Sequence, residues 1–494
     1  MRFKIEGIDI LYTKNLKIER KINEHSYCEI SFVTKEEFSG IVNRYKNLIS
    51  HSFSLQAIEE VKNGEKEQII FSGYIAEVKI SKNFAENIIT LICYSNSKKD
   101  DIEKYTYIYQ NENKTLGDIL KQINFVSVAP TYLEENIENI NFKLPVVQND
   151  ETNFMFLKKL LNENYKNLMV ESLLSSQRIW IGKREGNTYQ IDTDFLEIIF
   201  LKNESKIKIT LLNEYYELGD IIEILQNRYF IIENNIEYKE GVCYCEYILV
   251  DDYSSVKVEK NSLLDRKFLG EVIENKDKEA LGRVQLKFKE DKYVNGQSDL
   301  YWFKVMTPYS TQDTGFYFIP SKGDKVLVHF IEDIEPIILG SIRKNGHDNF
   351  KNPNELFIKN DYGKEIDIKE KEINIVSIFD NIYLSLDEEK IEINNGDTGL
   401  YIEKEKIVFQ NKNNAIIIDD GITIKKEKGG EVKIDNNIQL KANKSELNLK
   451  EDIVMTSSDN IQLKTNKSGL GLQENINLEG KKLSVKAKNI VVGS

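Results

Sequence analysis

The C-terminal quarter of the chain consists of a repeated triplet in which two apolar residues flank a mostly polar one. This alternation has the period of two that marks a β-strand with one buried face. The triplets run from Ile366 to Val492 in about seventeen units, at a mean spacing of roughly eight residues. Asn, Asp, Lys, Ser and Gly, which favour tight turns, connect them. The pattern predicts a repeat architecture of short strands over residues 366–494.

Strands of three to five residues are not stable alone, so these units must stack on copies of themselves. Two arrangements satisfy this requirement. One chain can coil with three strands per turn, or three chains can wind together so that each contributes strands to all three faces of a prism. Both give a stiff rod, the needle, on the order of 80 Å long. The apolar positions expected to form its core are Ile416, Ile418, Ile438, Leu440, Ile461, Leu463, Ile476 and Leu478.

Residues 264–345 are expected to form a small all-β barrel. Alternating segments separated by turn signals fill this stretch, and five or six short strands in about 75 residues fit a closed barrel. The predicted strands are 268–273, 282–288, 301–306, 315–320, 325–331 and 337–342.

The first 263 residues have a mixed pattern. One helix is predicted to open at Thr115, since Asp118 three residues later completes a capping box, and a second helix is predicted over 152–163. The remaining predicted elements are strands at 69–80, 88–94, 179–183, 220–225, 229–233 and 242–250. The domain boundaries expected from these patterns are 1–263, 264–345, a neck linker at 346–365, and 366–494.

Composition and charge restrict the class of protein. The 494 residues exceed the size at which one core stops growing, and 40% apolar with 30% charged residues excludes wholesale disorder. A net charge of −13 disfavours nucleic acid and anionic lipid as partners. The sequence contains neither an apolar stretch of about 20 residues nor a signal-peptide core at its start. We therefore expect a soluble protein made in the cytoplasm.

The candidate chemistry is sparse, and we expect no enzyme, no cofactor and no metal site. Four scattered histidines, His25, His51, His329 and His347, form no zinc or Ser-His-Asp pattern. The acidic cluster Glu332, Asp333 and Glu335 lies in a turn, where carboxylates are usually solvated. No complete phosphate-binding glycine loop is present.

The cysteines are expected to be buried, reduced side chains. Cys243 and Cys245 flank Tyr244, so both thiols lie on one face of a strand. A zinc site needs two further ligands, for which Cys28 and Cys93 are the candidates, but a second Cys-x-Cys pair is missing.

Several motifs resemble a known family. The segments 281–288 (LGRVQLKF), 301–305, 315–320, 323–328 and 334–342 look like the oligonucleotide/oligosaccharide-binding barrel of the valine-glycine repeat protein G (VgrG) spikes. Upstream, 151–160 (ETNFMFLKKL) is similar to the helix of the contractile-phage tail hub. Hub, barrel and repeat needle occur in the family's order over nearly the whole chain.

The resemblance implies a mainly β protein with few helices: a tail-hub-like N-terminal half, a small barrel and an intertwined triple-stranded β-helix. It implies a homotrimer whose hub segments form a ring with pseudo-sixfold symmetry, matched to a hexameric inner-tube protein and held by baseplate proteins. Sheath contraction then drives tube and spike through a target envelope, so that the particle is delivered outside the cell or into a target. A PAAR-type tip protein, with or without effectors, is expected to dock at Ile490, Val491 and Val492.

The chain also departs from parts of the family pattern. About 20 residues separate Arg343 from Ile366, too few for the lysozyme domain of some phage spikes. The last histidine is His347, which disfavours a His-x-His iron tip, and any toxin cargo is expected on another polypeptide. The competing hypothesis from another class is a carbohydrate-active enzyme or adhesin on a single-chain β-solenoid. The absence of aromatic residues after Phe409 argues against sugar stacking on the needle.

Overall fold

The computed structural model describes residues 1–442 with short gaps. The gaps are 62–63, 83–85, 124, 126–130, 174–177, 185, 192–193, 202–205, 254–255, 257–264, 293–298, 312–313, 332–333, 344–351, 427–429 and 435–437. The chain divides into two compact units, Met1–Gly346 and His347–Ser494. The expected boundaries between hub, barrel, neck and needle stay predictions.

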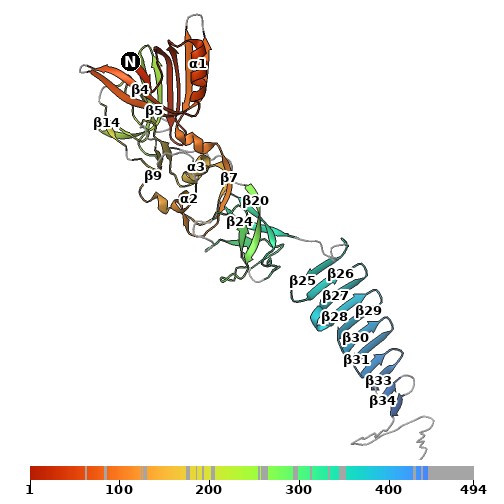
Figure 1. The fold of residues 1–494 in the computed structure, drawn as a ribbon. Coiled ribbons are helices and arrows are strands. Elements are labelled where there is room, and N and C mark those ends of the chain that lie inside the picture. The colour runs from red at the N-terminus through yellow and green to blue at the C-terminus, as the bar shows by residue number, and fades with distance from the viewer. Residues whose placement is uncertain are drawn as a thin grey trace, which may run out of the picture. The chain divides into compact units, whose positions relative to one another are not determined.

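A 12-stranded sheet forms the hub, the N-terminal part of the first unit (Figure 1). Its main path runs β1-β4-β5-β6-β3-β2-β18-β19-β16-β15, with β17 beside β18 and β14 beside β17. The strands are β1 Arg2–Ile5, β2 Tyr12–Lys21, β3 Tyr27–Thr34, β4 Ser52–Val61, β5 Gly64–Lys82, β6 Asn87–Tyr94, β14 Thr188–Gln190, β15 Glu197–Leu201, β16 Lys206–Leu212, β17 Ile221–Ile224, β18 Asn227–Lys239 and β19 Val242–Val250. Helix α1, Phe38–Tyr45, which the sequence patterns did not predict, follows β3.

The hub sheet contains an internal duplication. The order β5-β6-β3-β2 is followed by β18-β19-β16-β15. In each half a long hairpin, β5-β6 or β18-β19, is followed by a shorter one, β3-β2 or β16-β15. Both long hairpins carry a bulge at the same place, after Ile75 in β5 and after Ile231 in β18. The first repeat joins the second head to tail through β2 and β18.

Hydrogen bonds next to the two bulges repeat as well. Ile75 donates its N–H to the carbonyl of His51 at 3.0 Å and accepts from Ser50 at 2.8 Å. Ile231 donates to Asp220 at 3.0 Å and accepts from Gly219 at 2.9 Å. Ser50 and Gly219 both have positive φ, 70° and 81°, so the flanking turns have the same left-handed conformation. These matches make Ile75 and Ile231 equivalent positions.

Helices and short strands between the two repeats form a second core. Thr115 and Asp118 make the predicted capping box at the start of α2, and Thr152 caps α3 by accepting from the N–H of Met155. The elements are β7 Lys104–Tyr109, β8 Lys114–Thr115, α2 Leu116–Gln122, β9 Thr131–Leu133, β10 Asn141–Phe142, β11 Val146–Thr152, α3 Asn153–Glu163, β12 Leu168–Val170 and β13 Ile179–Ile181. Both predicted helices are confirmed.

The barrel is closed by five strands in the order β20-β21-β22-β24-β23. These are β20 Asp265–Glu274, β21 Val284–Phe288, β22 Trp302–Val305, β23 Lys325–Ile331 and β24 Ile334–Ile342. The predicted strand at 315–320 is wrong, since this segment contributes only an isolated bridge between Ser310 and Gly315. Phe316, Tyr317 and Phe318 there are about half exposed or more, so this run of aromatic residues does not form a strand of the barrel wall.

The second unit contains one 11-stranded antiparallel sheet in which each strand pairs with the next along the chain (Figure 1). The strands are β25 Leu356–Lys359, β26 Lys364–Ile368, β27 Glu372–Ser377, β28 Ile382–Asp387, β29 Lys390–Asn395, β30 Thr398–Glu403, β31 Lys406–Asn411, β32 Asn414–Ile418, β33 Ile422–Lys426, β34 Gly430–Ile434 and β35 Ile438–Ala442. β25 lies in the stretch expected to be a neck. Overall, the mainly β fold with few helices and a small barrel is confirmed.

Candidate assembly interfaces

One face of the 11-stranded sheet carries two unbroken columns of apolar residues. The register places each column member directly opposite the corresponding member on the next strand. The first column is Ile358, Ile366, Ile375, Leu384, Ile393, Leu400, Phe409, Ile416, Ile424, Val432 and Leu440. The second is Leu356, Ile368, Ile373, Leu386, Ile391, Ile402, Ile407, Ile418, Ile422, Ile434 and Ile438. We call this surface the aliphatic face.

The aliphatic face is largely uncovered in a single chain. Among the column members whose side chains the structure describes, fourteen leave 37–64% of their surface exposed. A contiguous apolar surface of this extent marks a protein–protein interface on a soluble molecule. Fully burying one aliphatic side chain contributes roughly 1.5–3 kcal/mol, so covering the face offers a large driving force for association.

The opposite face of the sheet is mixed: it carries charged and polar side chains that pair with one another, together with the apolar residues Phe357, Val376, Val408 and Ile417. Glu392 is only 8% exposed and accepts hydrogen bonds from the Nζ of Lys390 at 2.6 Å and from the hydroxyl of Tyr383. These two partners lower the pKa of the Glu392 carboxyl. Lys359 pairs with Glu365 at 3.0 Å, and Lys369 with Asp367 at 3.2 Å. Most charged groups of this face therefore have partners within one chain, whereas the apolar columns of the aliphatic face are largely uncovered.

The predicted needle residues are only partly within the described structure. Ile416 and Ile418 lie on the aliphatic face, one in each column, and Ile438 and Leu440 continue the backbone register. Ile461, Leu463, Ile476 and Leu478 fall outside the described residues, as do the expected docking positions Ile490, Val491 and Val492.

Strand pairing in the described strands differs from both arrangements of the sequence analysis. A single chain coiling with three strands per turn pairs each strand with the third one along, in parallel. Here every strand from β25 to β35 pairs with its immediate neighbour, and all pairs are antiparallel. The single-chain solenoid expectation is therefore wrong for this part of the chain. The expectation of strands interlocked across three chains is wrong here as well, because β26 to β34 are paired on both edges within one chain. Association of three chains stays a prediction.

The internal seam of the hub, where β2 meets β18, is closely packed. Ile18 lies opposite Ile236, and both side chains are fully buried. Arg20 lies opposite Asn234 and donates from Nη1 to its Oδ1 at 2.8 Å. Arg20 also donates to the Ser172 hydroxyl at 2.6 Å.

The outer edges of the two repeats lack such partners. β15 is the last strand of the sheet, and its residue Phe200 is 68% exposed. At the other end, β4 pairs with β5 only as far as Tyr74. Beyond Ile75, the edge of β5 facing away from β6 pairs with no strand among the described residues. Sequence analysis did not identify these edges, although the apolar run 198–201 was an available signal.

The barrel is joined to the rest of its unit by backbone and side-chain hydrogen bonds. Ile108 of β7 donates its N–H to Glu290 and accepts from Lys292, at 3.0 and 2.9 Å. The amide of Gln110, fully buried, donates to the Leu286 carbonyl at 3.0 Å and to Asp291 at 2.8 Å. Ile108 and Val147 complete the apolar core of the barrel. These contacts hold hub and barrel in one unit.

The histidines have structural surroundings. His25 stacks on Phe154, bonds Ser97 at 2.8 Å and lies 3.3 Å from Asp101, and burial lowers the pKa of its imidazole. His329 pairs with exposed Asp265 at 2.6 Å. His347 lies outside the described residues.

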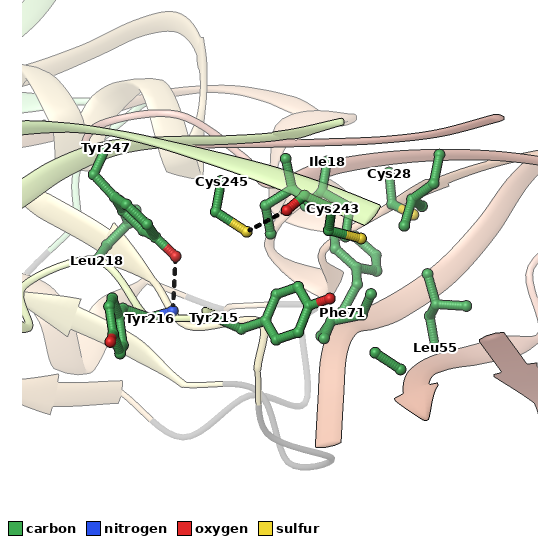
Figure 2. Close-up of a cluster of buried hydrophobic side chains, with 14 of the residues drawn as sticks. Ile18, Cys28, Leu55, Phe71, Tyr215, Tyr216, Leu218, Cys243, Cys245 and Tyr247 are labelled. Carbon is green, nitrogen blue, oxygen red and sulfur yellow. Dashed lines mark hydrogen bonds between the residues drawn. The ribbon is translucent and has the colours of Figure 1, made fainter. Parts of the chain in front are cut away.

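The cysteines are free and buried (Figure 2). Cys28 of β3 lies directly opposite Cys93 of β6, and Cys243 and Cys245 face the same core from β19. Burial raises the pKa of each thiol. Over the part of the chain that the structure describes, no group of three or more His, Cys, Asp and Glu has a geometry that could hold a metal ion.

The acidic cluster supplies no carboxylate pair in the described structure. Glu335 forms an ion pair with Lys304 at the exposed barrel surface, while Glu332 and Asp333 lie outside the described residues. Among the helices of the described residues, none has the length and apolar character needed to span a membrane.

The barrel matches a family model. Residues 268–342 match the model of the Type VI secretion system/phage-baseplate injector OB domain. A search of curated proteins found no match.

Solved structures with a similar fold come from secretion and phage systems. One is a Francisella PdpA–VgrG complex, with 11% identity, a TM-score of 0.50, and coverage of 86% of this chain and 79% of that chain. Another is the Escherichia coli c3393 protein, a component of the type VI secretion system similar to the T4 phage tail proteins gp27 and gp5. It has 12% identity, a TM-score of 0.48, and coverage of 69% and 100%. The 43 kDa tail protein of prophage MuSo2 from Shewanella oneidensis has 8% identity, a TM-score of 0.37, and coverage of 51% and 98%.

Together the family-model match and the fold likeness confirm the resemblance to VgrG-like hub-spike proteins that the barrel motifs indicated. Residues 268–342 thus resemble the OB domain of type VI secretion and phage-baseplate injectors, and the fold of the chain is similar to that of the VgrG complex.

Proposed function

We propose that the chain is the subunit of a homotrimeric hub-spike at the tip of a contractile injection apparatus. In this role the hub meets a hexameric inner tube and the baseplate, and the needle punctures a target envelope. A PAAR-type protein binds the needle tip, which also carries effectors. The particle is assembled in the producing cell and delivered outward on contraction.

The aliphatic face is the observation that carries this proposal. Its two columns run through all eleven strands without a polar interruption, so a matching apolar surface is needed along the whole sheet. Three copies, each turning its aliphatic face inward, bury the columns against one another as a three-sided prism. The polar faces then point outward, where their ion pairs keep neighbouring needles from aggregating.

Mechanical work requires a needle that does not fray. In a three-chain prism each sheet is held by backbone hydrogen bonds along its own chain and by apolar contacts with two others. One chain cannot leave without exposing all three aliphatic faces, so the assembly unfolds cooperatively.

Measurement of mass in solution tests the proposal. Native mass spectrometry of the full chain is expected to give a particle of three times 57.4 kDa. The variant Ile424→Glu places a charge in the first column, at a side chain that is 44% exposed in one chain. Burying that charge without a partner costs several kcal/mol per copy, so trimer content is expected to fall at least tenfold at micromolar concentration.

Lys425→Glu is the matched control. Lys425 follows Ile424 on strand β33, so its side chain points to the opposite face of the sheet. The control is expected to stay trimeric. A monomeric wild-type chain, or an Ile424→Glu variant that keeps its full trimer content, contradicts the proposal.

A further inference from the structure

Two turns on one side of the 11-stranded sheet carry exposed aromatic residues. Because each strand pairs with the next along the chain, successive turns alternate between the two sides of the sheet (Figure 1). The turns after β25 and β27 lie on one side and hold Tyr362 and Phe379, which are 77% and 76% exposed. Ile378, next to Phe379, is 46% exposed. We call Tyr362, Ile378 and Phe379 the aromatic edge.

The other described turns of the sheet are polar. On the same side, the turns after β29 and β31 are 396–397 (GD) and 412–413 (KN). On the opposite side, the turns are 369–371 (KEK), 388–389 (EE), 404–405 (KE) and 419–421 (DDG). Large apolar side chains are therefore confined to two turns of one side, where turn geometry alone does not call for them.

Hydrogen bonds and close packing hold Phe379 in place. The N–H of Ile378 donates to the carbonyl of Gly363 at 2.9 Å. A Cβ built on Gly363 lies 2.7 Å from the ring of Phe379, so the ring packs directly on the glycine backbone. The carboxylate of Asp380 accepts a hydrogen bond from the ammonium of Lys364 at 2.7 Å. The ring is thus ordered in the single chain, and covering it costs little additional conformational entropy.

A second copy of the same sheet is the partner that this edge fits. We infer that the aromatic edge of one copy packs against the turn 369–371 of the next copy, where Phe379 covers the stem and ammonium of Lys371. The inference rests on the proposed trimer and assigns a specific contact to the corner between two of its sheets.

Threefold symmetry brings these two turns together. When three identical sheets turn their aliphatic faces to a common axis, the side of each sheet that carries the aromatic edge adjoins the opposite side of the next sheet. The turns after β26 and β27 differ in height by one strand, about 4.8 Å along the stack. This difference is within reach of a phenylalanine and a lysine side chain.

The aromatic edge is also continuous with the aliphatic face. Ile382 follows the edge at the start of β28, on the same side of that strand as Leu384 of the first column, and is 41% exposed. A neighbouring copy that covers the aliphatic face therefore reaches the corner at Ile378 and Phe379 as well.

Lys371 is suited to contact an aromatic ring. Its side chain is 69% exposed, and its ammonium lies 3.8 Å from the carboxylate of Glu388, which is 68% exposed, so this surface ion pair holds it only weakly. A lysine packs its aliphatic stem on apolar surface and places its ammonium over the negative face of a ring. The chain uses this pairing elsewhere, since Nζ of Lys292 lies 4.4 Å from the ring centroid of Tyr107.

Photo-cross-linking in the full-length chain tests the contact. p-Benzoylphenylalanine incorporated at Phe379 keeps an aromatic side chain at that position and reacts with neighbouring C–H bonds under ultraviolet light. It is expected to give covalent dimers and trimers on a denaturing gel, with the cross-link mapped by mass spectrometry to 369–371. The matched control carries the same amino acid at Tyr401, which lies on the face opposite the aliphatic columns. The control is expected to give at least tenfold less cross-linking between copies.

Charge reversal at the lysine gives a second test. Lys371→Glu replaces attraction to the ring face by repulsion, so the yield of cross-links from position 379 is expected to fall at least threefold. Lys404→Glu, in the turn after β30 on the same side of the sheet, is the matched control and should leave the yield unchanged. Both lysines are exposed, so neither change removes a core contact.

The outcomes separate this inference from the proposed function. A chain that is trimeric by mass overturns the corner contact, and leaves the trimer standing, if cross-links from position 379 are absent, map outside 369–371, or equal those from position 401. Equal yields in the two lysine variants overturn the role given to Lys371. A monomeric chain overturns the proposed function itself, and the corner contact with it.

Discussion

Asn234 of β18 lies directly opposite Arg20 of β2, and its Oδ1 accepts a hydrogen bond from the guanidinium at 2.8 Å. The arginine is fully buried at the seam between the two hub repeats and also donates to the Ile70 carbonyl and the Ser172 hydroxyl. Its Nε lies 3.9 Å from the carboxylate of Glu217, which is itself buried. This polar cluster ties the first repeat to the second.

Replacement of Arg20 by methionine is expected to destabilise the hub strongly. The substitution keeps the apolar volume but leaves the Glu217 carboxylate and the Asn234 amide without their cationic partner. Removing one member of a buried charge cluster costs about 3–5 kcal/mol. Differential scanning calorimetry of Arg20→Met checks this. Lys17→Met, on the same strand but half exposed, is the control and should change little; equal unfolding temperatures for both variants contradict the role given to Arg20.

Lys114 is expected to make the stability of the chain depend on pH. Burial lowers the pKa of its ammonium to about 7, while the unfolded chain keeps the ordinary value near 10.5. Between these two values the unfolded state binds more protons than the folded state, so the free energy of unfolding rises with pH. Lys114→Met is expected to remove this rise from pH 7 to 10 in urea denaturation.

At pH 10, where the wild-type amine is neutral, the same variant should lower stability by at least about 1–3 kcal/mol, because Nζ of Lys114 donates to the carbonyls of Asn111, Phe142 and Leu144. The loss should be smaller at pH 7. Lys143→Met, at an exposed neighbour, is expected to keep the wild-type slope. If the free energy of unfolding of Lys114→Met rises with pH as steeply as that of the wild type, Lys114 is not a neutral buried amine.

Gly73 allows β5 to approach β6 closely. A Cβ built on Gly73 lies 2.1 Å from the carbonyl oxygen of Tyr94, which is far inside van der Waals contact. Gly73→Ala is therefore expected to displace the strand pair and destabilise the hub by more than about 2 kcal/mol. Thermal unfolding followed by circular dichroism measures this. Gly40→Ala in α1, where a Cβ meets no atom within 4 Å, should leave stability unchanged or slightly raised.

The four cysteines are expected to be unreactive until the hub unfolds. All are buried, and desolvation raises the pKa of Cys243 to about 11 and those of the other three further. Because the thiolate is the reactive species, a disulfide reagent at pH 8 should label no thiol in the native chain and four in denaturant. Rapid labelling of one thiol in the native state contradicts the core packing in Figure 2.

Local sequence was sufficient wherever neighbouring residues determine the structure. The capping box of Thr115 and Asp118 starts α2 as predicted, because its hydrogen bonds join residues three apart. The period of two along 366–434 predicted strands with one apolar face, since alternation needs no distant partner. The predicted strand at 315–320 was wrong, because this run of consecutive aromatic residues contributes only an isolated bridge at Gly315.

Pairing between distant segments was decided by the tertiary structure alone. The triplets do not indicate whether a strand pairs with its neighbour or with the third strand along the chain. In the structure each strand from β25 to β35 pairs with its neighbour. Likewise, the two hub repeats share too little sequence pattern to be recognised, and only the matching bulges at Ile75 and Ile231 make them equivalent. Alternation of side chains is fixed within one strand. Hydrogen-bonded partners depend on how the connections close, from the short turns between β29 and β32 to the long connection between β2 and β18.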